Sequence, residues 1–97
     1  MHTYFQAQKS FFFASFSQFL QVSWIRHHDL HILTVGGYTY TADMRFRSIF
    51  NTASGNDEWI LQIQYVQKRD AGRYECQLNT QPVRSFFVQL TVVGKCF

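Results

Sequence analysis

The sequence predicts an all-β fold, a two-layer antiparallel sandwich, and three observations predict it. Apolar and polar residues alternate from residue 22 onward, and no stretch keeps the spacing of a helix. Turn residues recur at intervals near ten, which divides this region into seven short candidate strands. A motif between residues 70 and 76 suits a tight bend that leads into a strand facing the core. At 97 residues, the chain has the length of a single domain.

Four of the candidate strands lie in the first half of this region, and Gly36-Gly37 separates two of them. Glycine accepts positive φ without steric cost, so this pair is a strong two-residue turn signal. The expected strands cover residues 22–26, 30–35, 38–41 and 45–50.

The other three strands follow a polar loop at residues 51–57. The clearest alternation is at residues 59–63, where Trp59, Leu61 and Ile63 are predicted to face one way and Gln62 the opposite way. After a turn at 68–72, the last strands are expected at residues 74–78 and 86–92, with Pro82 in their connection.

The decisive motif is Asp-x-Gly-x-Tyr-x-Cys, formed by Asp70, Gly72, Tyr74 and Cys76. Tyr74 and Cys76 are two residues apart, so both point into the core, and the Tyr74 hydroxyl can return to the backbone as a tyrosine corner. Gly72 permits the bend. The motif predicts an immunoglobulin-like sandwich, with these predicted structural residues: Trp24, Arg45, Asp70, Gly72, Tyr74 and Cys76.

Trp24 is expected to be the core tryptophan packed beside Cys76, and Arg45 to form an ion pair with Asp70. The predicted core contains Trp24, Phe46, Trp59, Leu61, Ile63, Tyr74, Cys76 and Leu90.

Composition excludes several functions. The net charge of +3 comes from scattered Lys and Arg residues without a basic run, so we expect no nucleic-acid binding. His27 and His28 point to opposite faces of a strand and cannot easily share a metal ion. We find no phosphate loop, paired carboxylate site or Ser-His-Asp arrangement. The chain is therefore predicted to be neither an enzyme nor a cofactor- or metal-binding protein.

Residues 1–21 form an atypical N-terminal segment. Residues 10–20 have the length of a signal-peptide apolar region, yet no small-x-small cleavage site follows, so a signal and an aromatic segment without a defined role both stay open. No later stretch is long and apolar enough to span a membrane. Residues 22–93 are the predicted domain, and residues 94–97 a tail.

The residues quoted above also resemble a known family. Residues 22–36, residues 38–41, Arg45-Phe46 and residues 74–77 are similar to the first immunoglobulin domain of the Dpr (defective proboscis extension response) family of neuronal surface proteins. The resemblance covers residues 22–93. It implies a V-type domain that binds DIP immunoglobulin proteins through strands C, C′, C″, F and G. It also implies a place at the plasma membrane of neurons, in synaptic partner matching.

One feature departs from the family. No cysteine precedes Cys76, and residues 1–21 do not resemble strands A and B, so the sandwich is predicted to be incomplete, with these strands missing or altered. Either the chain is a truncated or mis-spliced product, or its domain lacks the disulfide. The alternative function is that of a truncated fragment that cannot fold alone. We expect no bond between Cys76 and Cys96, since the latter lies past the last strand.

The predicted partner-binding surface is the outward face of the C–F–G sheet. Trp24 and Cys76 point inward, so their strand neighbours point outward, and these include the apolar, aromatic and amide residues that interfaces favour. The alternative is ordinary partial exposure of a two-layer fold. The predicted binding residues are Ile25, His27, Leu33, Tyr38, Tyr40, Gln77, Asn79, Phe87 and Gln89.

Overall fold

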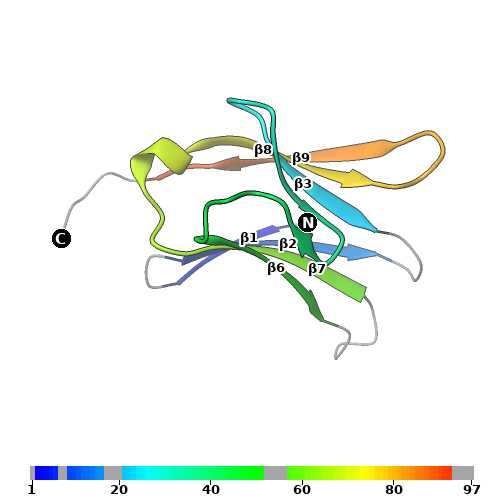
Figure 1. Cartoon of the computed structure of the whole chain (residues 1–97), viewed down its shortest axis with the longest axis horizontal. Coiled ribbons are helices and arrows are strands. Elements are labelled where there is room, and N and C mark those ends of the chain that lie inside the picture. The colour runs from blue at the N-terminus through cyan, green and yellow to red at the C-terminus, as the bar shows by residue number, and fades with distance from the viewer. Residues whose placement is uncertain (1, 7–8, 17–20, 52–56, 93–97) are drawn as a thin grey trace.

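The chain folds into two antiparallel sheets that lie face to face, seen as separate layers in the computed structural model of Figure 1. The structure describes residues 2–6, 9–16, 21–51 and 57–92. The four-stranded sheet has the order β1-β2-β7-β6. It consists of β1 (His2–Gln6), β2 (Lys9–Phe16), β6 (Phe46–Asn51) and β7 (Asp57–Ile63).

The five-stranded sheet has the order β5-β4-β3-β8-β9, and a single 3-10 turn, η1 (Lys68–Asp70), is the only helical element of the described residues. The strands are β3 (Val22–Arg26), β4 (His31–Val35), β5 (Tyr38–Thr39), β8 (Gly72–Leu78) and β9 (Arg84–Leu90). All seven predicted strands are present; β3 has the predicted limits, and those of the other six are shifted. The all-β prediction is confirmed.

Residues 2–6 and 9–16 complete the four-stranded sheet. β2 pairs with β7 from Ser10↔Ile63 to Phe16↔Asp57, and β1 pairs with the other edge of β2. The two strands that we expected to be missing or altered are thus present as strands of altered sequence. The division of the chain at residues 22 and 94 stays a prediction.

The core lies between the two sheets, and Trp24 and Cys76 sit directly opposite each other on β3 and β8. Seven of the eight predicted core residues are buried, while Trp59 is partly buried and packs against this core. The one-core prediction is confirmed. The hydrophobic core consists of these buried residues: Val22, Trp24, Leu33, Phe46, Leu61, Ile63, Tyr74, Cys76, Leu78 and Leu90.

Gln62 was predicted to point outward, but it does not lie on an exposed surface. Its side chain is only 7% exposed. β7 is a central strand flanked by β2 and β6, and neighbours on both sides of a central strand cover a side chain that an edge strand would expose. Alternation along one strand predicts the direction of Gln62 but not how far the neighbouring strands cover it.

The motif residues and Arg45 form a hydrogen-bonded group at one end of the sandwich, which we call the anchor. The Tyr74 hydroxyl donates to the Asp70 carbonyl at 2.6 Å, and Gly72 has a φ of +134°, which favours glycine. The Arg45 guanidinium donates to both oxygens of the Asp70 carboxylate, at 2.7 and 2.9 Å. The predicted Arg45–Asp70 ion pair is confirmed, and Asp43 also binds Arg45, at 2.9 Å.

Cys76 is a free thiol buried in the core, and burial raises its pKa to about 12. Because the thiolate is the reactive form, we expect iodoacetamide at pH 8 to leave Cys76 unmodified in the folded chain and to alkylate it in guanidinium, as measured by peptide mass mapping. Alkylation at the same rate in both states would contradict the buried position. Cys96 lies outside the described residues. A bond between the two cysteines, which we predict to be absent, would block alkylation in both states until a reductant is added.

Candidate functional site: the outer face of the five-stranded sheet

The strand register places three rows of side chains on the outer face of the five-stranded sheet. Cys76 and Phe86 are paired and lie on the core side, so the neighbouring pairs lie on the opposite side. This outer face is the candidate site, and we call it the docking face. Its first row is Tyr38, Val35, Ser23, Gln77 and Ser85; its second is Ile32, Ile25, Glu75 and Phe87; its third is His27, Arg73 and Gln89.

Large apolar side chains are exposed at intervals across the docking face. Ile32 and Phe87 are 48% and 49% exposed, and Tyr38 at the edge is 77% exposed. Tyr40 follows β5, is also exposed, and its ring lies 6.2 Å from that of Tyr38. Ile25, which lies between Ile32 and Glu75 in the second row, is half-buried. Aromatic and aliphatic residues spread among polar ones are the composition of protein–protein interfaces.

Leu33 is not on the docking face, and its prediction as a binding residue is wrong. It is completely buried and belongs to the core cluster. The pairing of β3 with β4 shifts between Trp24 and Ile25, so that Ile25 pairs with Ile32 while Trp24 pairs with Thr34. This bulge inserts Leu33 as an extra residue and breaks the alternation that had placed it outward.

Ile32 takes the outward position instead, and the sequence reading missed it. A bulge leaves no mark in an apolar–polar pattern this short, so no signal in residues 30–35 could have identified it. Glu75 was missed as well, although its place between the inward-facing Tyr74 and Cys76 was a sufficient signal.

Glu75 is the centre of a hydrogen-bonded group on the docking face. Its carboxylate contacts His27 Nε2 at 2.7 Å and accepts from Gln77 Nε2 at 3.0 Å and from Ser85 Oγ at 2.5 Å. These partners come from the end of β3, from β8 and from β9. The group therefore ties together the three strands that form the middle and one edge of the face.

Two side chains, His27 and Arg73, contact the ring of Phe87. The His27 ring meets it edge-on, with centroids 5.2 Å apart at an interplanar angle of 76°, and the Arg73 guanidinium lies 4.6 Å from its centroid. Each contact is of a kind that stabilises aromatic side chains. Phe87 is therefore both half-exposed and fixed in orientation.

Two other predicted binding residues are exposed at the ends of the strands. Gln89 lies beside Arg73 in the third row. Asn79 follows β8, and its side-chain oxygen accepts a hydrogen bond from the Gln21 backbone at 2.9 Å. Asn79 is thus joined to the residue that precedes β3, and its side-chain oxygen already accepts a hydrogen bond within the chain.

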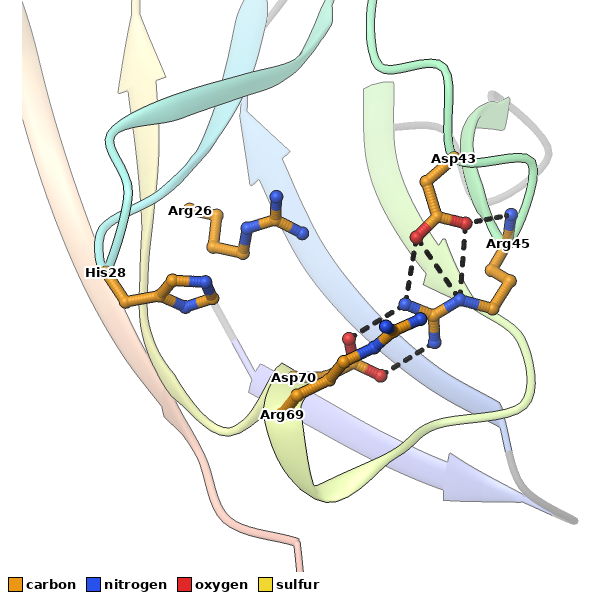
Figure 2. A pocket seen from close by; sticks show the side chains of 6 residues that line it. All are labelled: Arg26, His28, Asp43, Arg45, Arg69 and Asp70. Atoms are coloured by element: carbon orange, nitrogen blue, oxygen red, sulfur yellow. Dashed lines mark hydrogen bonds and ion pairs between the residues drawn. The ribbon is translucent and has the colours of Figure 1, made fainter.

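A pocket at the Arg45–Asp70 end of the sandwich, away from the docking face, contains ion pairs (Figure 2). Three arginines line it, and two of them are engaged: Arg45 with Asp70 and Asp43, and Arg26 with Asp29 at 2.8 Å. Its three arginines face two lining aspartates, Asp43 and Asp70, and Asp29 pairs with Arg26, so most of its charge is already paired within the chain. The pocket is explained as part of the anchor.

Within the described ranges, no group of three or more His, Cys, Asp or Glu side chains is placed to hold a metal ion. In the same part of the chain, no helix has the length and apolar character needed to cross a membrane.

Solved immunoglobulin domains share this architecture. The chain is similar to the first immunoglobulin domain of Dpr1, crystallised bound to the first immunoglobulin domain of DIP-eta, with 47% identity, a TM-score of 0.79 and coverage of 90% of this chain and 82% of that one. It is also similar to the first immunoglobulin domain of Dpr11 bound to DIP-gamma, with 44% identity, a TM-score of 0.78 and coverage of 89% and 90%.

A curated relative is the Zwei Ig domain protein zig-8 of Caenorhabditis elegans, 29% identical over 73 residues. The match covers 75% of this chain and 26% of that protein, so the chain spans about a quarter of its relative's length. No family model matches the chain.

Proposed function

Because the chain is a Dpr-like first immunoglobulin domain, we propose that it is a cell-surface recognition module that docks a partner immunoglobulin domain of the DIP type on the docking face. The proposal rests on the composition of the outer surface of the five-stranded sheet. It combines exposed apolar side chains with a polar group whose hydrogen bonds are already satisfied. Such a surface loses little when a partner removes it from water.

The wider role that we propose is partner matching between neurons, at the plasma membrane and the synapse. The support is the likeness to Dpr domains bound to DIP proteins, joined to the residue resemblance across residues 22–93. The predicted binding residues other than Leu33 belong to this proposal: Ile25, His27, Tyr38, Tyr40, Gln77, Asn79, Phe87 and Gln89. The alternative of a fragment that cannot fold alone has less support, because β1 and β2 complete the second sheet.

The test is surface plasmon resonance of the purified chain against the first immunoglobulin domain of DIP-eta. Tyr40→Asp and Gln77→Asp are each expected to weaken binding more than about tenfold, since each places a charge in a surface that the partner would desolvate. Tyr65→Asp is the matched control, because Tyr65 is 64% exposed, close to the 65% of Tyr40, and lies in the turn after β7. Loss of binding in the control but not in the other two would place the partner on a different face.

A further inference from the structure

Glu75 combines an outward direction with burial. It shares a row with Ile25 and Phe87 on the docking face, yet only 7% of it is exposed, because its three hydrogen-bonding partners surround it. A buried carboxylate is costly unless its oxygens are satisfied, and here both are. One of those partners, His27, contacts Glu75 through Nε2, and this contact decides whether its other ring nitrogen, Nδ1, carries a hydrogen.

The contact decides which ring nitrogen of His27 carries the proton. Burial alone would raise the pKa of Glu75, but hydrogen bonds from Ser85, His27 and Gln77 lower it below its usual value. The carboxylate is therefore ionised at neutral pH and can only accept hydrogen bonds. His27 Nε2, 2.7 Å from the carboxylate, must then carry a hydrogen, and a ring with that single hydrogen presents Nδ1 as an acceptor.

The ring is also held in place. Phe87 contacts it edge-on, and the His27 backbone N–H donates to the Arg73 carbonyl at 2.9 Å, which continues the pairing of β3 with β8. The His27 side chain remains 22% exposed. Among the described residues, the contact with Glu75 is the single hydrogen bond of the ring, so Nδ1 has no acceptor role within the chain.

We infer that Glu75 is a positioning residue that fixes His27 with its hydrogen on Nε2, and that His27 Nδ1 accepts a hydrogen bond from the docked partner. This inference rests on the proposed docking function. It specifies the partner's chemistry: a hydroxyl, amide or ammonium group must lie opposite His27. A carboxylate or carbonyl oxygen there would meet a second acceptor and would be rejected.

The first experiment needs no partner. In the ¹⁵N-labelled full chain at neutral pH, long-range ¹H–¹⁵N spectra are expected to show His27 protonated at Nε2 and not at Nδ1. Glu75→Gln should yield a mixture of the two forms, because an amide can either accept from or donate to the ring. The matched control is Glu58→Gln, a carboxylate on β7 that accepts from Asn51, and it should leave the His27 spectrum unchanged. An Nδ1-protonated ring in the wild type, or no change in Glu75→Gln, would overturn the positioning role.

The second experiment tests the acceptor with the first immunoglobulin domain of DIP-eta as the probe. The side-chain oxygen of His27→Asn can take the place of Nδ1, whereas His27→Gln places its amide near the position of Nε2. We expect His27→Gln to lose about tenfold more affinity than His27→Asn. Equal losses, or the reverse order, would contradict the donor requirement. Absence of binding by the wild type would count against the docking function with this partner, while the spectra would still decide the role of Glu75.

Discussion

Asp70→Ala is expected to lower the free energy of unfolding by about 3 kcal/mol, the lower end of the range for breaking a buried ion pair. Asp70 is 1% exposed, and its carboxylate holds both the Arg45 guanidinium and the Gln67 backbone N–H, the latter at 2.7 Å. Asp43 remains as a partner for Arg45, which is why the expected loss is not larger. Since small domains are stable by only about 5–15 kcal/mol, the change is readily measured by urea denaturation followed by tryptophan fluorescence.

Asp29→Ala is the matched control. Asp29 forms an ion pair with Arg26, but its side chain is 40% exposed, so its loss should cost under about 1 kcal/mol. Equal losses in the two variants would show that the Arg45–Asp70 pair is not an anchor.

The pH dependence of stability provides a second readout of the same pair. Burial alone would raise the pKa of Asp70, yet hydrogen bonds from Arg45 and Gln67 lower it overall. A carboxyl group whose pKa is depressed in the folded state stabilises that state above its unfolded pKa, about 3.9, and loses this contribution as the pH falls. The difference between the wild type and Asp70→Ala should therefore be full at pH 7 and shrink below about pH 4.

The anchor could be predicted from the sequence because its chemistry is local. Gly72, Tyr74 and Cys76 lie on one strand, so their spacing alone decides which of them face inward. The tyrosine corner joins two residues that are four positions apart, Tyr74 and Asp70. Only the contact with Arg45 is distant in the sequence, and the charge of a nearly buried Asp70 requires such a partner.

The errors came from features that depend on neighbouring strands. The direction of Leu33 follows from a bulge in the pairing with β3, and a single extra residue reverses every later position. The burial of Gln62 follows from β2, which belongs to the part of the sequence that departs from the resemblance. The docking face was predicted in outline, because the alternation of β8 and β9 is regular, but the role of Glu75 depends on His27 and Ser85 from two other strands.

The position of Phe87 makes it the residue of the docking face whose replacement should weaken partner binding most. It is 49% exposed, it is held in one orientation by His27 and Arg73, and it shares the middle row with Ile25 and Glu75. An aromatic side chain that is fixed before binding loses little conformational freedom when a partner covers it, and aromatic residues often carry much of the binding energy of an interface.

We expect Phe87→Asp to weaken binding to the first immunoglobulin domain of DIP-eta by about a hundredfold or more, as measured by surface plasmon resonance. The variant removes the ring and places a carboxylate close to that of Glu75, in a surface from which the partner excludes water. Phe87→Leu keeps an apolar side chain but loses the contacts with His27 and Arg73, so its affinity should fall between those of the wild type and Phe87→Asp. Met44→Asp is the control for a new surface charge, because Met44 is 91% exposed and precedes β6 of the other sheet. If Met44→Asp and Phe87→Asp weaken binding equally, the effect comes from the change in net charge, and Phe87 makes no special contribution to binding.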